Sequence, residues 1–245
     1  MLKKIRLEPL IISLSRKVLI LKKLVPHPAF YVRDDQITTV RDFAAFELNK
    51  SDWVQWWICI DLPDYSWKMA LHHLLRTSNF TPVIVDIGSK VGILTFKLAM
   101  GLNRSGVENY KIFSFDPNPF TAGKFSRIKE LNLLTDESLR FYLEVLSNIT
   151  GITKFGFKMD NTGTGSLSGS SIEIQQNTLT TFCVDNSIHK IDFIKIDVEG
   201  FEPFVLEGVR EIIERGMPAM YIEISPKMFI FNIWTAEEIF NYLFS

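Results

Sequence analysis

The chain has 245 residues, of which 47% are hydrophobic and 22% charged, enough for one α/β domain with a buried core and an N-terminal extension. The formal net charge of −1 gives no reason to expect a nucleic-acid partner. The two cysteines, Cys59 and Cys183, lack metal-binding spacing and favour reduced thiols in a cytoplasmic protein.

Residues 1–29 form a basic N-terminal segment. Residues 1–23 contain seven Lys or Arg residues and one Glu, so this stretch is strongly positive and the rest of the chain is negative. Apolar residues recur at helical spacing over residues 1–25, but basic residues interrupt them too often for a membrane span or a cleavable signal. Two interpretations stay open. One is a helix packed on its own domain or on a partner subunit, and the other is an amphipathic helix that makes peripheral contact with an anionic membrane.

Residues 30–80 are predicted to form a mixed, aromatic-rich cap ahead of a core domain at residues 81–245. Four tryptophans fall close together in the cap: Trp53, Trp56, Trp57 and Trp67. We expect them to pack in the cap's own core, with stacking on a sugar face as the alternative. A helix is expected over residues 68–76.

From Thr81 onward, apolar strands and helical segments alternate, which predicts a mostly parallel sheet with helices on both faces. Core strands are expected at residues 83–87, 111–115, 141–147, 191–197 and 219–225. Helices are expected at about residues 92–102, 119–131 and 203–215, and a last helix begins at a capping box that starts at Thr235. Between the third and fourth core strands, residues 154–159 and 171–176 predict an extra strand pair joined by a Gly/Ser/Thr-rich loop.

Three of the predicted strands end on an acid, namely Asp86, Asp116 and Asp197. Ligands bind outside the carboxyl ends of the strands in open α/β sheets, so these acids predict a site at one sheet edge. The turn after the first strand contains Gly88 and Gly92 but lacks the Gly-x-Gly-x-x-Gly pattern of dinucleotide-binding proteins. An acid at a strand end favours a cation over a phosphate, and Asp116 is placed to accept hydrogen bonds from a ribose. This combination favours S-adenosylmethionine, which carries a ribose and positive charge but no phosphate.

Four segments of the core domain resemble FkbM-type S-adenosylmethionine-dependent methyltransferases. They are residues 85–92, 115–119, 192–202 and 221–226, and the most specific part is Lys-Ile-Asp-Val-Glu-Gly at residues 195–200. The resemblance implies a Rossmann-like class I methyltransferase that acts on a hydroxyl group of a sugar, glycan or secondary metabolite. Its partner would be a small-molecule or glycan acceptor.

The chain departs from the family pattern at three positions. Lys90 stands where the family usually has Asn, Thr180 where an Asp is common, and Ser225 where a His is frequent. The sequence also stops before the antiparallel strand pair that usually closes a class I methyltransferase sheet, so we expect these final strands to be missing.

We expect S-adenosylmethionine at the ends of the first three strands. The residues predicted to bind it are Asp86, Gly88, Ser89, Gly92, Asp116, Pro117, Asn118 and Ser147. Asp197 and Glu199 flank Val198 and leave the chain on the same side, so we predict both as catalytic residues facing the acceptor. They would act as a general base, and joint binding of a divalent metal ion is the less favoured alternative. Lys195 and Glu223 are predicted to form a buried ion pair between neighbouring strands.

Two other functions remain as alternatives. A catalytically degenerate methyltransferase fold could serve as a binding module, as Lys90, Thr180 and Ser225 suggest. Against it stand the four acids Asp86, Asp116, Asp197 and Glu199, which an inactive site has no physical need to keep. A nicotinamide-dependent oxidoreductase is disfavoured because the third glycine of the dinucleotide pattern is absent.

Overall fold

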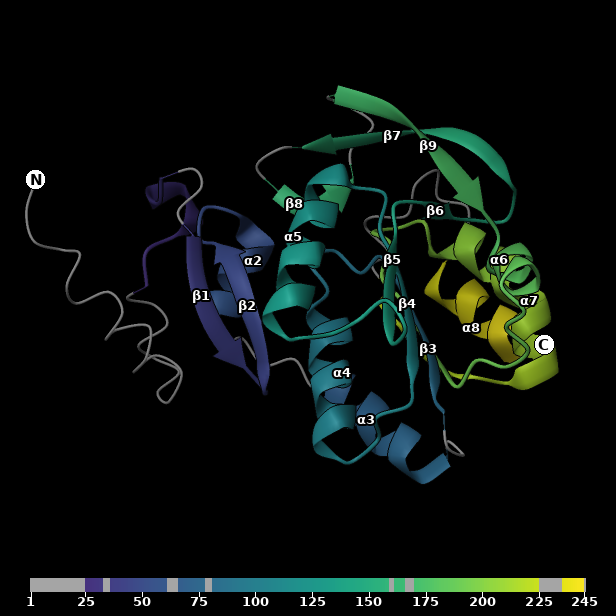
Figure 1. The fold of residues 1–245 in the computed structure, drawn as a ribbon. Helices are drawn as coiled ribbons and strands as arrows, with labels where there is room; N and C mark the ends of the chain where they lie inside the picture. The colour runs from purple at the N-terminus through teal and green to yellow at the C-terminus, as the bar shows by residue number, and fades with distance from the viewer. Residues whose placement is uncertain are drawn as a thin grey trace, which may run out of the picture.

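The computed structural model describes residues 25–32, 36–60, 66–77, 81–158, 161–165, 170–224 and 235–244 (Figure 1). The N-terminal helix predicted for residues 1–25 lies almost entirely outside the described residues. None of the helices in the described ranges combines the length and the apolar character that crossing a membrane requires.

A five-stranded parallel sheet forms the centre of the fold (Figure 1). In spatial order its strands are β11 (Ala219–Ile222), β10 (Phe193–Ile196), β3 (Val83–Ile87), β4 (Lys111–Phe115) and β5 (Leu139–Tyr142). The chain builds outward from β3 in one direction through β4 and β5, and then returns to add β10 and β11 on the other side. The strand order therefore reverses between β3 and β10, and this switch point is where open α/β sheets bind ligands.

Helices cover both faces of the central sheet, as the sequence predicts (Figure 1). One face carries α3 (Ser66–Thr77), α4 (Ile93–Arg104) and α5 (Pro119–Leu131), and the other carries α6 (Leu179–Asp185), α7 (Glu202–Gly216) and α8 (Ala236–Phe244). Alternate strand residues supply the two cores, because successive side chains point to opposite faces. Ile84 and Ile112 pack with the first set of helices, whereas Val85 and Phe113 pack with the second.

The predicted element positions agree closely with the structure for most of the core domain. The strands at residues 83–87 and 111–115 and the helix at residues 119–131 have the predicted bounds. The capping box of α8 is also present, since Thr235 N donates to Glu238 Oε2 at 2.5 Å and Glu238 N donates to Thr235 Oγ1 at 3.2 Å. Helix α6 was not predicted. Within the described residues no strand follows β11, which has β10 as its one hydrogen-bonded neighbour.

The cap contains an antiparallel hairpin and a short helix. Its elements are the 3-10 helix η3 (Pro28–Phe30), β1 (Gln36–Arg41), β2 (Ala44–Asn49) and α2 (Trp53–Cys59). Asn132, which follows α5, joins the hairpin to the core domain, because its side-chain amide exchanges two hydrogen bonds with the backbone of Ala45 at 2.7 and 2.8 Å. Trp67 is buried as predicted, whereas Trp53 and Trp57 are 39% and 45% exposed, so the expectation of core packing was wrong for these two.

A second sheet follows β5 and lies across the end of the central sheet where the strands terminate (Figure 1). Its order is β6 (Val145–Leu146), β9 (Ser170–Asn177), β7 (Gly151–Lys158) and β8 (Asn161–Gly165). The antiparallel pairing of β7 with β9 confirms the predicted extra strand pair. The single strand predicted at residues 141–147 was wrong. The chain leaves the central sheet after Tyr142, and residues 145–146 pair with β9 instead.

Gly208 of α7 fixes how closely this helix approaches the second sheet. A methyl group at Gly208 would lie 1.8 Å from the carbonyl oxygen of Ser147, which follows β6. We therefore expect Gly208→Ala to lower the free energy of unfolding by more than about 2 kcal/mol, since helix or sheet must move. Urea denaturation would measure the change. Gly123→Ala in α5 is the matched control, because a methyl group there meets open space. It should raise stability by about 0.5–1 kcal/mol. Equal effects of the two substitutions would contradict the packing argument.

Candidate functional site

A pocket of about 210 Å³ lies between the carboxyl ends of the central strands and the second sheet. From the strand ends, the polar groups that line it include Lys90, Asp116, Asn118, Asp197 and Glu199. From the second sheet, the lining includes Thr153, Lys154, Phe155 and Gln176. The pocket is therefore at the switch point between β3 and β10, with the second sheet on its far side.

The structure brings six of the ten predicted site residues to this pocket. They are Gly88, Asp116, Pro117, Asn118, Asp197 and Glu199. The other four, Asp86, Ser89, Gly92 and Ser147, are buried and lie outside its lining. Their contacts are within the protein, so the structure gives them a supporting position behind the residues that face the pocket.

The turn after β3 packs directly against the end of β10. Gly88 N and Ser89 N both donate to Phe115 O, at 2.9 and 3.0 Å, which ties the turn to the end of β4. Gly88 has a φ of 73°, and a side chain there would place its first carbon 1.9 Å from Asp197 O. Only glycine fits this position. The close approach brings Lys90 and Asp197 to the same side of the pocket.

Asp116 is fixed in place before any ligand arrives. Its Oδ1 accepts hydrogen bonds from Asn118 N at 2.9 Å and Thr121 Oγ1 at 2.8 Å, and its Oδ2 accepts one from Lys90 N at 2.9 Å. Burial raises the pKa of Asp116, and these hydrogen bonds oppose the rise. A carboxylate offers about four acceptor positions, so Asp116 retains one for a ligand hydroxyl.

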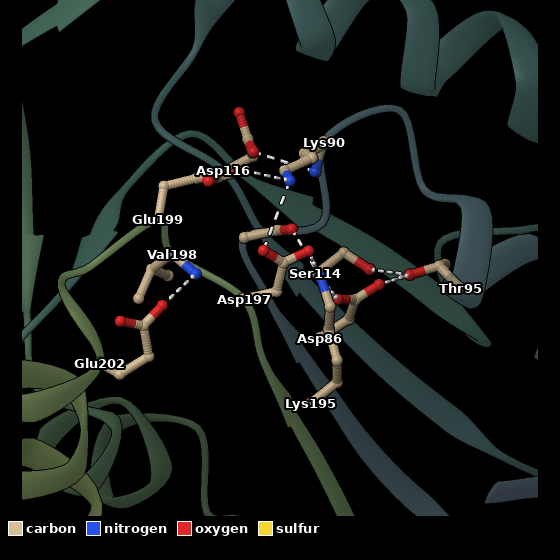
Figure 2. Close-up of polar contacts among 11 residues, drawn as sticks. Asp86, Lys90, Thr95, Ser114, Asp116, Lys195, Asp197, Val198, Glu199 and Glu202 are labelled. Atoms are coloured by element: carbon tan, nitrogen blue, oxygen red, sulfur yellow. Dashed lines mark hydrogen bonds and ion pairs between the residues drawn. The ribbon is translucent and has the colours of Figure 1, made fainter. Parts of the chain in front are cut away.

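Lys195 lies at the centre of the buried charges (Figure 2). Its ammonium group lies 3.3 Å from Asp86 Oδ1 and 3.1 Å from Asp197 Oδ2, and it donates to Gly88 O at 2.8 Å. Burial lowers the pKa of Lys195, but the two carboxylates outweigh burial and raise it. Thr95 Oγ1 donates to Asp86 Oδ2 at 2.6 Å and completes the environment of that carboxylate.

The predicted ion pair between Lys195 and Glu223 was wrong. In the register of the sheet, Lys195 is level with Tyr221 of β11 on one side and with Asp86 of β3 on the other. Its ammonium turns toward Asp86 and not toward β11, while Glu223 lies beyond the end of β11 and is exposed. The sequence placed the right strands side by side but paired the lysine with the wrong neighbour.

Lys90 supplies a second ammonium group at the same site (Figure 2). Lys90 Nζ lies 2.7 Å from Glu199 Oε1 and 3.4 Å from Asp197 Oδ1. Burial lowers the pKa of Lys90, but the neighbouring carboxylates raise it overall. Burial likewise opposes the charged form of Asp197, yet Lys195 and Lys90 together hold the pKa of Asp197 below its usual value. Both lysines and Asp197 are therefore charged at neutral pH.

Two further carboxylates shape the site and were not predicted. Glu202, at the start of α7, accepts a hydrogen bond from Val198 N at 3.2 Å (Figure 2). It accepts a second from Gly200 N, also at 3.2 Å, and so holds the loop that carries Glu199. Its place in the first turn of a helix was the available signal. Glu144, between β5 and β6, lines the pocket with Oε2 buried and without a hydrogen-bond partner, and burial raises its pKa. No sequence signal marks Glu144. It reaches the pocket because the chain breaks between β5 and β6, and the sequence predicted one continuous strand there.

Within the ranges that the structure describes, no group of three or more His, Cys, Asp or Glu side chains is arranged to hold a metal ion.

Comparison with known proteins identifies a family. The model of the methyltransferase FkbM domain matches residues 86–245, well over half of the chain, in agreement with the resemblance found in the sequence. No curated protein matches the chain.

Several solved structures resemble the fold at low sequence identity. The FkbM methyltransferase from Methylobacillus flagellatus KT is 17% identical, with a TM-score of 0.45, over 69% of this chain and 38% of that one. A SAM-dependent methyltransferase from Agrobacterium tumefaciens is 10% identical, with a TM-score of 0.48, over 80% of this chain and 55% of that one. The Pyrococcus abyssi tRNA (uracil-54, C5)-methyltransferase, solved with S-adenosyl-L-homocysteine, is 14% identical, with a TM-score of 0.38, over 73% and 32%. The chain thus spans well under two thirds of these proteins.

Removing the central ammonium group tests its contribution to stability. Lys195→Met would leave Asp86 and Asp197 without their shared partner in a buried position, so we expect a loss of about 3–5 kcal/mol in the free energy of unfolding. Lys190→Met is the control. Lys190 pairs with Asp192 at 2.6 Å, but its side chain is 64% exposed, so that loss should stay below about 1 kcal/mol. Chemical denaturation of both variants gives the comparison, and similar losses would mean that Lys195 does not hold the site together.

Proposed function

The chain belongs to the FkbM methyltransferase family, and we propose that it transfers a methyl group from S-adenosylmethionine to a hydroxyl group of a sugar, glycan or secondary metabolite. The observation that carries this proposal is that Asp116, Asp197 and Glu199 line the same pocket. Asp116, which suits the cofactor's ribose, therefore faces the same pocket as Asp197 and Glu199, which suit the acceptor.

The pocket residues fit the cofactor in chemical character. Asp116 keeps one acceptor position for a ribose hydroxyl, and the adjoining Pro117 and Asn118 line the same part of the pocket. Gly88 lets the backbone of the first turn lie close to the backbone of Asp197, at the edge of the pocket. When bound, S-adenosylmethionine supplies an electrophilic methyl group on a sulfonium. The protein's main contribution would be to hold the acceptor oxygen near that methyl group, in line with the bond that breaks.

Glu199 is the proposed general base. A hydroxyl acceptor is a poor nucleophile until its proton is removed, which a carboxylate in the pocket can accomplish. Asp197 suits this role less well, because the depressed pKa that its two lysine neighbours produce makes it a weaker base. Asp197 would instead fix the ammonium groups of Lys195 and Lys90, and Lys90 in turn contacts Glu199. The ammonium group of Lys90 between the two carboxylates also supports the base over the alternative in which they bind a divalent metal ion.

The second sheet offers an acceptor several kinds of polar and aromatic contact. It adds hydroxyl, ammonium, aromatic and amide groups to the pocket through Thr153, Lys154, Phe155 and Gln176. Such groups can donate to and accept from the hydroxyls of a sugar or a natural product while an aromatic ring contacts its apolar face. The binding-module alternative shares this geometry but requires no turnover.

Cofactor binding is tested by calorimetric titration of the protein with S-adenosylhomocysteine, S-adenosylmethionine and NAD. We expect both sulfur ligands to bind, and Asp116→Ala to weaken them by roughly 1–3 kcal/mol through the loss of a hydrogen bond to a charged group. Asp136→Ala is the matched control, since Asp136 is 83% exposed beside Lys129 and should leave binding unchanged. NAD binding without any response to S-adenosylhomocysteine would contradict the proposal.

Turnover tests the role of Glu199 once a screen of labelled methyl transfer over glycans and secondary metabolites has identified an acceptor. Glu199→Gln keeps the size of the side chain but removes its basicity, so we expect kcat to fall by roughly 10²–10⁴. Glu211→Gln on the exposed side of α7 should keep full activity. Full turnover of Glu199→Gln would rule out the base. Loss of wild-type activity with a chelator, and its recovery with a divalent ion, would favour the metal alternative.

A further inference from the structure

The cap exposes a group of large apolar side chains on η3, just after it, and on α2. We call this group the aromatic surface, and its members are Phe30 (82% exposed), Val32 (78%), Trp53 (39%) and Trp57 (45%). The ring of His27 joins its two parts. It lies 5.0 Å from the ring of Trp53, which is 6.0 Å from the ring of Trp57, and His27 O accepts a hydrogen bond from Phe30 N at 2.9 Å. Apolar side chains that gather in this way on an exposed surface mark a site of interaction.

The aromatic surface is separate from the pocket. The hairpin of the cap packs on α4 and α5, on the side of these helices that faces away from the central sheet (Figure 1). The residues that line the pocket all belong to the core domain, between Ile87 and Phe201. This separation argues against stacking of Trp53 and Trp57 on the sugar of an acceptor bound in the pocket, so the aromatic surface calls for another partner.

The charges of the chain beside the aromatic surface favour a negative partner. Residues 1–23 contain seven Lys or Arg and one Glu, which gives them a net charge of +6. They join the described domain at Val25, which is buried against Trp56 of α2 and against Ile60. Neither residues 25–32 nor residues 53–60 contain an Asp or Glu. The basic segment therefore enters the cap next to the aromatic surface, and the residues that form this surface add no negative charge.

We propose that the aromatic surface, together with basic residues 1–23, docks the protein on an anionic phospholipid bilayer. Tryptophan rings are favoured at the level of the lipid headgroups, because they combine a large apolar area with one N–H donor. Lys and Arg residues are attracted to anionic headgroups, and the two contributions together give firmer binding than either alone. A second copy of the chain is the less favoured occupant, because the interface would bring two segments of charge +6 together. The inference goes beyond the proposed function and does not depend on it.

The test is sedimentation of the full chain with vesicles of phosphatidylcholine alone and of phosphatidylcholine mixed with phosphatidylserine. We expect binding to the mixed vesicles to be at least about tenfold stronger, and to weaken as the salt concentration rises. Phe30→Ser and Trp57→Ser should each weaken binding to the mixed vesicles by roughly tenfold, since each removes apolar area that the bilayer would bury. Ile152→Ser is the matched control, because Ile152 is 73% exposed on β7, outside the cap, and its replacement should leave binding unchanged.

Tryptophan fluorescence gives a second measurement. Brominated phospholipids in the mixed vesicles should quench the emission of the wild-type protein, and should quench Trp57→Ser less. If Trp57→Ser does not fold, Phe30→Ser decides, because a side chain that is 82% exposed contributes little to the core.

Three results would overturn the inference: no sedimentation with the mixed vesicles, equal binding to both kinds of vesicle, or wild-type binding by the folded surface variants. Light scattering covers the other occupant. A dimer that Phe30→Ser and Trp57→Ser dissociate would make this surface an interface between copies of the chain, and the bilayer would be the wrong partner. None of these measurements involves the cofactor, so their failure is distinct from failure of the proposed function.

Discussion

The ammonium group of Lys195 joins β3 and β10, the two strands between which the strand order of the central sheet reverses. Asp86 is the second-last residue of β3 and Asp197 follows β10, so their carboxylates would repel each other at the switch point without a cation between them. Lys195 satisfies both and also binds the carbonyl of Gly88, which fixes the first turn against the end of β10. The pocket depends on this arrangement, because the turn after β3 and the loop after β10 carry residues that line it.

Hydrogen bonds on both sides of Lys195 fix further parts of the pocket in place. The turn after β3 presents the backbone N–H of Lys90 to Asp116, so the acid at the end of β4 is oriented by the neighbouring strand's turn. On the other side, Glu202 holds the backbone around Glu199 from the first turn of α7. These contacts are formed within the protein itself. A ligand then finds its polar partners already in place, which lowers the entropic cost of binding and of reaching the transition state.

The sequence predicted β3, β4 and β10 well because each is a short, continuous apolar run with an acid at or next to its end, and such runs carry their own boundaries. The same strand ends drew attention to Asp116, Asp197 and Glu199, which line the pocket, but not to Glu144. The sequence could not identify the partner of Lys195, since an ion pair between strands depends on register and on side-chain direction, not on local pattern. Nor could it show that the chain leaves the central sheet between Tyr142 and Val145, because residues 141–147 are mostly apolar and look like one strand. That break brings Glu144 and the second sheet to the pocket.

The acids at this site differ in how Lys195 and Lys90 contact them, and so in the roles open to them. Asp86 lies outside the pocket lining and supports the sheet, and Asp197 is held charged by both ammonium groups, so neither is well placed to take up a proton. Asp116 is committed to three internal hydrogen bonds and has one acceptor position left. Glu199 differs from these three, because its carboxylate is paired with the flexible end of the Lys90 side chain. An acceptor hydroxyl that entered from the second sheet could therefore compete for Glu199 without disturbing the buried network, which leaves the sheet rigid while the chemistry proceeds at its edge.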